Sequence, residues 1–155
     1  MVDSNNHPDV VVNPFLICLG ALALAIAAQL LLPLPFLPLT AARIAGAAVF
    51  LVGIAFGLPA ARGMRAARTT FSPNRTSTAL VTSGRFQISR NPVYIAMLLN
   101  YVGLAIFFGT PWGLLLIPGV MWLMDRWVIV PEEKHLEERF GAAYAEYRQA
   151  VHRWL

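Results

Sequence analysis

Two long stretches without a charged residue constrain this chain more than any other feature of its sequence. They run from Val10 to Ala42 and from Asn91 to Leu123. A helix needs about 20 apolar residues to cross the hydrocarbon core of a bilayer, so each stretch can hold at least one span. Charged residues make up 13% of the chain, well below the usual share of about 25% in soluble domains. We therefore expect an integral membrane protein, not a soluble globule or a disordered chain.

Proline and glycine divide these stretches into shorter segments. The first stretch ends in a proline-punctuated turn over residues 33–38, and a Gly- and Ala-rich segment follows. The second stretch is too long for one span. The segment from Phe108 to Trp112 contains Gly and Pro and is predicted to be a tight turn that joins two spans as a hairpin. The chain is thus predicted to be a single all-α membrane domain over residues 1–155, with four transmembrane helices over residues 14–32, 41–61, 92–108 and 111–129.

The C-terminal segment 131–154 predicts an amphipathic helix that lies against the membrane or the bundle. Pro131 suits a first helical turn, and Glu132 and Glu133 are favourable at its positive end. Apolar residues recur in this segment at mostly helical spacing. They are Leu136, Phe140, Tyr144, Tyr147, Val151 and Trp154.

The basic residues predict the orientation in the membrane. The two short turns between spans carry no Lys or Arg, whereas the middle segment carries six arginines and the C-terminal segment carries more. The positive-inside rule then places both termini on the cytoplasmic side. The Ala-, Arg-, Leu- and Pro-rich composition is typical of a bacterial inner membrane protein. The arginines of the middle segment are Arg62, Arg65, Arg68, Arg75, Arg85 and Arg90.

The same charge pattern excludes other classes of partner. A net charge of +4 and a pI near 9.8 are compatible with nucleic-acid binding, but the arginines cluster beside apolar spans, where they match membrane lipids instead. A single cysteine and three widely spaced histidines argue against a metal site. We expect membrane lipids and a lipid-like small molecule as partners, and no nucleic acid; the oligomeric state is open.

Two polar patches are candidates for chemistry, and both fall on the predicted cytoplasmic side. The first contains Gly84, which permits a tight turn, and Arg90, and leads into the third span. The second follows the fourth span. Because a hairpin joins these spans, residues about 40 positions apart meet at one face. The expected pocket contains Arg90, Tyr94, Glu132 and Glu133.

Many of the polar and aromatic residues near the predicted cytoplasmic face also have a structural interpretation, and lipid-headgroup contact is the one for Arg85 and Arg90. The arginines at 62–68 suit lipid headgroups, and Asp125 and Arg126 suit an ion pair that ends the fourth span. Glu132 and Glu133 suit a helix cap that pairs with Lys134 or Arg139. Tyr144, Tyr147 and Trp154 suit the membrane interface. His135 is expected at an exposed helix position.

Two ordered motifs resemble a known group of enzymes. Residues 84–94, GRFQISRNPVY, resemble a G-x-x-x-x-x-R-[HN]-P-x-Y signature. The segment from Glu132 to Trp154 resembles an E-E-x-x-L, F-G-x-x-Y-x-x-Y and V-x-R-[WF] ending. These are the marks of isoprenylcysteine carboxyl methyltransferase-like and phospholipid methyltransferase-like integral membrane enzymes. The resemblance covers roughly residues 40–155.

The resemblance implies methyl transfer from S-adenosyl-L-methionine to a lipophilic acceptor, either an isoprenylcysteine-type carboxylate or a lipid amine. A carboxylate needs alignment and exclusion of water more than acid–base help, which favours an O-methyltransferase. Arg90 suits the carboxylate of the cofactor, Glu132 its ribose hydroxyls or ammonium, with Glu133 in support. Arg126 is the candidate that orients an acceptor carboxylate, beside Arg90 as a second catalytic candidate. The implied cofactor-binding residues are Arg90, Asn91, Pro92, Tyr94, Leu98, Glu132, Glu133, Leu136 and Phe140, with Leu98, Leu136 and Phe140 over the adenine.

Two other functions fit the same sequence. A sterol-reductase-like, NADPH-dependent membrane reductase shares a similar C-terminal region, but the chain offers little polar sequence to hold a dinucleotide. A non-enzymatic helical membrane subunit would tolerate loss of Arg90, Tyr94 and Glu132 without losing a ligand. Asn91 stands where histidine is common in eukaryotic members of the resembled family, so the role of that ring is absent here.

Overall fold

A computed structural model describes residues 12–67 and 79–155 of the protein, and these residues form helices, turns and loops without a β-strand. Arg68 and Arg75 of the basic segment lie outside the described residues. The helices are α1 (Pro14–Leu31), α2 (Leu39–Ala66), the 3-10 turn η1 (Gly84–Gln87), α3 (Pro92–Phe107), α4 (Pro111–Leu115), α5 (Ile117–Met124), the π-helical turn η2 (Asp125–Ile129), α6 (Val130–Phe140) and α7 (Ala142–Ala150).

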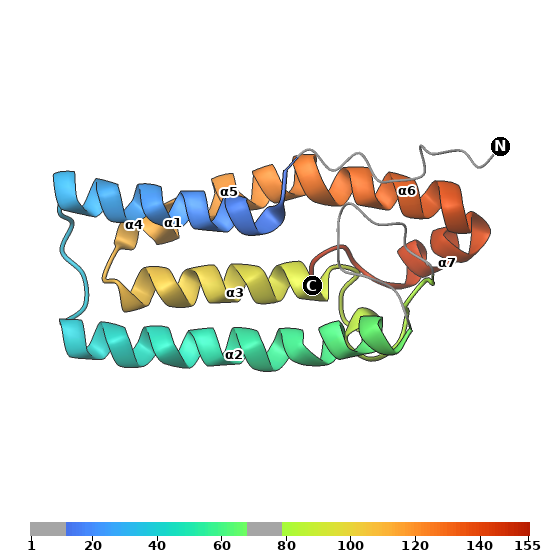
Figure 1. The fold of residues 1–155 in the computed structure, drawn as a ribbon, viewed down its shortest axis with the longest axis horizontal. Helices are drawn as coiled ribbons and strands as arrows, with labels where there is room; N and C mark the ends of the chain where they lie inside the picture. The colour runs from blue at the N-terminus through green and yellow to red at the C-terminus, as the bar shows by residue number, and fades with distance from the viewer. Residues whose placement is uncertain (1–11, 68–78) are drawn as a thin grey trace.

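The helices form an elongated bundle with α3 in its middle (Figure 1). α2 packs along one side of α3, and α1 and α5 pack on the other side. α6 continues beyond α5, so that α6, α7 and the C-terminus gather where α3 begins (Figure 1). This arrangement brings the two polar patches to one end of the bundle.

Within residues 12–67 and 79–155, two helices are long and apolar enough to cross a membrane, namely α1 with 18 residues and α2 with 28. α3 is apolar as well but has 16 residues. Large apolar side chains point outward along the bundle, for example Leu30 at 79% exposure and Ile44 at 68%. Such surfaces suit lipid rather than water, and they fit membrane association. The four-span topology stays a prediction.

Glycine sets the close contact between α2 and α3. A Cβ atom added at Gly103 would lie 2.6 Å from the backbone nitrogen of Phe50, and one added at Gly46 would meet the backbone of Phe107. Because these contacts involve backbone atoms, no rotamer change relieves them. The two backbones therefore pack against each other directly, as small residues permit in membrane helices.

Two prolines shape the helical stretch that follows the hairpin turn. Pro118 lies at the start of α5, and Pro131 at the start of α6. Proline lacks the N–H that would bond four residues back, and its ring crowds that carbonyl. The helix accordingly breaks between α4 and α5, and it widens to a π-helical turn in η2 before Pro131.

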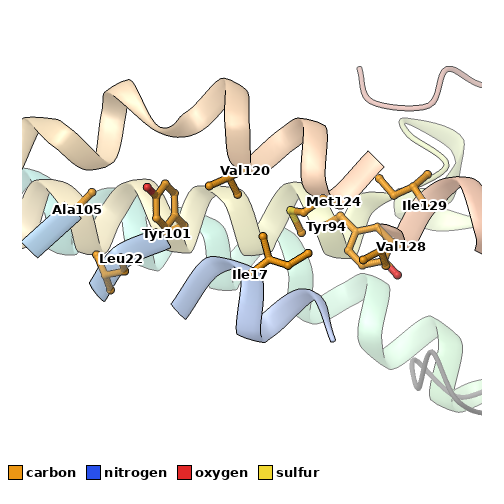
Figure 2. Packing of buried hydrophobic residues seen from close by; sticks show 9 residues of the cluster. All are labelled: Ile17, Leu22, Tyr94, Tyr101, Ala105, Val120, Met124, Val128 and Ile129. Atoms are coloured by element: carbon orange, nitrogen blue, oxygen red, sulfur yellow. The ribbon is translucent and has the colours of Figure 1, made fainter. Parts of the chain in front are cut away.

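The buried core lies around α3. Tyr94 and Tyr101 project from α3 among the apolar side chains of α1, α5 and η2, with Tyr101 near Leu22 and Val120 and Tyr94 near Met124, as Figure 2 shows. Tyr101 is buried, and its hydroxyl donates to the carbonyl of Gly113 at 2.8 Å. The core therefore holds α3 against α1, α5 and η2 without any charged group among the nine residues of this cluster.

The C-terminal segment differs from the single helix expected over residues 131–154. α6 ends at Phe140, and α7 begins at Ala142. Gly141 between them has a φ of +49°, a left-handed conformation that strongly favours glycine. After α7, Val151 adopts an extended conformation. The apolar residues of segment 131–154 recur at helical spacing on both sides of Gly141, so their periodicity did not predict this turn.

Candidate functional site

The start of α3 is held by the C-terminal tail. The backbone N–H of Arg90 donates to the carbonyl of His152 at 2.9 Å. Ser89 Oγ and Asn91 Nδ2 each donate to the carbonyl of Arg153 at 3.0 Å. Gly84, at a φ of +63°, makes the tight turn expected of it before this loop. The loop that carries the first motif is thus fixed by the tail that carries the last one.

Four charged side chains form a chain of ion pairs beneath this loop. Arg90 Nη1 lies 3.1 Å from Glu133 Oε1. Arg153 contacts Glu133 with both Nε, at 3.2 Å, and Nη2, at 2.6 Å. Its Nη1 also donates to Asp125 Oδ1 at 3.0 Å. Arg90 and Glu133 are nearly buried, with side chains 9% and 11% exposed.

The hydrogen bonds to Glu133 raise the pKa of the Arg153 guanidinium, which therefore stays charged. Each arginine in the network faces a carboxylate, so the four formal charges cancel. Arg90 retains one buried nitrogen, Nε, without a hydrogen-bond partner among the described residues. A buried N–H of this kind gains free energy when a ligand supplies an acceptor.

Glu132 is held apart from this network. Its Oε2 accepts a hydrogen bond of 2.7 Å from the hydroxyl of Tyr94, 38 residues away in the sequence. Burial raises the pKa of Glu132 above its ordinary value of 4.5, the hydrogen bond from Tyr94 lowers it, and the charge of Glu133 raises it. The net direction is upward. Glu132 is thus the one carboxylate of the site that no arginine neutralises among the contacts described.

A pocket opens beside these groups, with an enclosed volume of about 60 Å³. Tyr144 and Tyr147 from α7 form one wall. Burial raises the pKa of each tyrosine to about 12, so both are protonated at neutral pH. Tyr147 donates to the carbonyl of Phe86 at 2.6 Å, and Tyr144 accepts from Arg90 at 3.3 Å. The pocket is lined by Met64, Ala79, Leu80, Val81, Phe86, Arg90, Asn91, Glu132, Glu133, Leu136, Tyr144 and Tyr147.

Most of the expected site residues meet at this pocket. Five of them line it: Arg90, Asn91, Glu132, Glu133 and Leu136. Two others lie next to it. Pro92 is fully buried at the first turn of α3, and Tyr94 reaches the site through its bond to Glu132.

Three expected site residues lie elsewhere. Leu98 packs against the apolar core around α3. Phe140, at the end of α6, does not line the pocket, and the guanidinium of Arg139 lies 5.9 Å from the centre of its ring. Arg126 is exposed on η2 and does not line the pocket either. Of the three residues expected over the adenine, only Leu136 therefore lines the pocket.

Several residues at the site were expected in other roles. Asp125 pairs with Arg153 and not with its neighbour Arg126. Tyr144 and Tyr147 line the pocket, although an interfacial role was expected for them. His135 is 6% exposed and so is buried, not exposed. The signal for these tyrosines and for Arg153 was present in the C-terminal motif, whose Y-x-x-Y and V-x-R positions they occupy.

Parts of this chain are similar to known proteins. A family described as phospholipid methyltransferase matches residues 41–143. Protein-S-isoprenylcysteine O-methyltransferase B of Arabidopsis thaliana is 36% identical over 72 residues, which cover 46% of this chain. The match spans 36% of that relative's own length. No solved structure matches the chain. The segment matched by the family contains the start of α3 and all of α6, and hence Arg90, Glu132 and Glu133.

Proposed function

The chain belongs to the phospholipid methyltransferase family, and on that premise we propose that it transfers a methyl group from S-adenosylmethionine to a lipid-like acceptor at the cytoplasmic face of a membrane. One observation carries the proposal. Residues from α3 and α6, 38 residues apart, join in the Tyr94–Glu132 hydrogen bond beside a pocket that also presents Arg90. A membrane subunit without a ligand has no need of a buried carboxylate that faces a pocket.

The donors and acceptors of the pocket suit the two ends of S-adenosylmethionine. Arg90 lines the pocket with a guanidinium that suits the cofactor's carboxylate, and its buried Nε has no hydrogen-bond partner within residues 12–67 and 79–155. Glu132 offers carboxylate oxygens that suit its ammonium group or ribose hydroxyls. Leu136 and Phe86 supply apolar surface. The enclosed volume of about 60 Å³ is smaller than the several hundred Å³ typical of ligand sites, so the pocket holds one end of the cofactor and the rest extends through its opening.

The proposed reaction differs between an acceptor carboxylate and an acceptor amine. When bound, S-adenosylmethionine supplies an electrophilic methyl group on its sulfonium. An acceptor carboxylate would form the new O–CH3 bond with a lone pair as the S–CH3 bond breaks and S-adenosylhomocysteine leaves. It has no proton to lose, so the residues would need only to align it and exclude water. An acceptor amine must also lose a proton, and Glu132, whose pKa burial raises, or Glu133 is the candidate to take it. Arg126 remains the candidate to orient an acceptor carboxylate from the edge of the site.

The membrane arrangement is part of the proposal. α1, α2, α3 and the stretch from α4 through η2 act as four spans, and both termini lie in the cytoplasm. The arginines at the end of α2 then meet the lipid headgroups, and α6 with α7 closes the pocket from the cytoplasmic side. Reporter fusions at Ala66 and at the C-terminus should both give a cytoplasmic signal. A signal from the opposite side in either fusion would overturn the four-span arrangement.

The direct test is cofactor binding. We expect the detergent-purified chain to bind S-adenosylmethionine and S-adenosylhomocysteine in calorimetry, and NADPH not to bind. Glu132→Ala should weaken binding at least about tenfold, because a hydrogen bond to a charged group contributes about 1.5–3 kcal/mol. Glu138→Ala is the matched control, since Glu138 lies on the same helix and its side chain is 65% exposed. Binding of NADPH alone would favour a reductase, and equal binding by both variants would exclude Glu132 from the site.

A further inference from the structure

A second cavity lies deeper in the bundle, between α1, α2 and α3. Its volume is about 210 Å³, and it is separate from the pocket beside Arg90. Nearly all of its lining is apolar. Phe15 and Leu19 at its edge are 61% and 50% exposed, so the cavity meets the outer surface of the bundle, where lipid is expected. It is lined by Phe15, Cys18, Leu19, Leu22, Phe50, Met97, Asn100, Tyr101 and Leu104.

Asn100 carries the most polar side chain of this cavity, which also holds the thiol of Cys18 and the hydroxyl of Tyr101. The hydroxyl of Tyr101 already donates to the carbonyl of Gly113. The amide oxygen of Asn100 is buried and has no hydrogen-bond partner within residues 12–67 and 79–155. The amide nitrogen is therefore the part of this side chain that can face the cavity. An amide in an apolar setting costs free energy unless it is bonded, and buried polar groups in membrane helices commonly mark ligand sites.

Asn100 also touches α2. A Cβ atom added at Gly53 would overlap Asn100 Oδ1, so this oxygen lies against the Cα of Gly53. Such a contact is at most a weak C–H···O interaction. A purely structural role in the contact between α2 and α3 is therefore the alternative that a test must separate from ligand binding.

The position of Asn100 links it to the first pocket. Asn100 follows Tyr94 by six residues on α3, which is about 9 Å along a helix axis. Tyr94 contacts Glu132 at the first pocket, and Met97 and Tyr101, on the turns between and beyond, line the second cavity. A lipid whose reactive end lies near Glu132 therefore has an apolar cavity in reach of its chain.

We propose that this cavity binds the hydrocarbon chain of the acceptor lipid and that Asn100 determines specificity by donating a hydrogen bond from its amide nitrogen to a hydroxyl or carbonyl oxygen carried on that chain. The inference rests on the proposed methyl transfer for the identity of the reacting end, but the chain preference is measurable without catalysis. A chain without such an oxygen leaves the amide of Asn100 unpaired, so plain hydrocarbon chains bind less tightly.

The test compares chains that differ only in one oxygen. Stearic acid and its mid-chain hydroxy and keto analogues compete with a fluorescent fatty acid for the detergent-purified chain. One added hydrogen bond predicts a preference of about threefold to tenfold for the oxygenated chains. Asn100→Leu, of similar size, should abolish or reverse this preference, and Met97→Leu, which changes the same cavity without a polar group, should keep it.

Asn100→Ala is a second variant for the same binding comparison. Its smaller side chain does not press against Gly53, so it serves if Asn100→Leu does not fold. A structural role predicts that both variants weaken every chain equally, and such a result would overturn the proposal, as would a wild-type protein without preference. Calorimetry with S-adenosylmethionine on the same samples separates the two proposals. Cofactor binding without chain preference refutes only the role of Asn100, whereas chain preference without cofactor binding refutes only the proposed function.

Discussion

The contact between α2 and α3 and the cluster at the start of α3 hold the molecule together by different means. Between α2 and α3, glycines let two backbones meet, and the amide oxygen of Asn100 lies against Gly53. At the start of α3, charged side chains from separate segments meet, namely Arg90, Asp125, Glu133 and Arg153. The first contact depends on the absence of side-chain atoms, and the second depends on the presence of particular ones. The contact between α2 and α3 should therefore be destabilised by added side-chain volume. The cluster at the start of α3 should be destabilised by the loss of a charge.

The largest effect is expected from added volume at Gly103. Gly103→Val places atoms against the backbone of Phe50, which cannot move aside without separating α2 from α3. We expect a loss of about 3 kcal/mol in the free energy of unfolding, at the upper end of the usual cost of overpacking. Thermal unfolding in one fixed detergent measures the change.

Gly20→Val is the matched control for this prediction. A Cβ atom at Gly20, in α1, meets nothing within 4 Å. Its effect should stay within about 0.5 kcal/mol, as for other surface substitutions. Equal losses for the two variants would show that valine disturbs any helix of this protein, and that the contact between α2 and α3 is not special.

A smaller loss is expected from removing one charge at the other region. Arg153→Met leaves Glu133 with one arginine and Asp125 with none. Breaking a buried pair costs about 3–5 kcal/mol, but the side chain of Arg153 is 32% exposed, so we expect a loss of about 1–3 kcal/mol. Chemical unfolding with a helical circular dichroism signal measures it.

Arg148→Met tests whether that loss is specific. Arg148 pairs with Glu137 at 3.4 Å, and both side chains are about half exposed. Exposed pairs contribute less than about 1 kcal/mol. Cofactor binding also distinguishes the two variants. Arg153→Met releases the C-terminal tail from Glu133 beside the pocket and should weaken cofactor binding, whereas Arg148→Met should leave cofactor affinity unchanged. A larger loss for Arg148→Met would contradict the importance of the four-residue network.

The two regions also differ in how far the sequence predicts them. The helices α1 and α3 begin at the prolines where the first and third apolar segments were expected to begin, because apolar runs and proline are local signals. The two polar patches and the expected hairpin predicted that Arg90, Glu132 and Glu133 meet at one pocket. They did not predict that Asp125 pairs with Arg153, because that contact depends on the turn at Gly141 and on the π-helical turn before Pro131. The partner of a charged side chain depends on the turns between helices, and the periodicity of a single helix does not predict those turns.

The smallest effect is expected from the proton on Glu132, since only one group titrates and the Tyr94 hydrogen bond opposes the effect of burial. Because folding raises the pKa of Glu132, the folded state holds this proton more tightly than the unfolded state does. Its stabilising contribution is complete below the ordinary value of 4.5 and is lost as pH rises through the folded pKa. Glu132→Gln mimics the protonated form, so the stability of the wild type relative to this variant should fall as pH rises above about 4.5.

Glu138→Gln, at an exposed position, is the control, and it should follow the wild type in urea unfolding across the same pH range. Tyr94→Phe removes a bond that lowers the pKa, so it should move the fall to higher pH. A stability difference between wild type and Glu132→Gln that does not change with pH would show that Glu132 titrates as an ordinary exposed carboxylate, and it would remove the physical reason for placing a proton acceptor at this pocket.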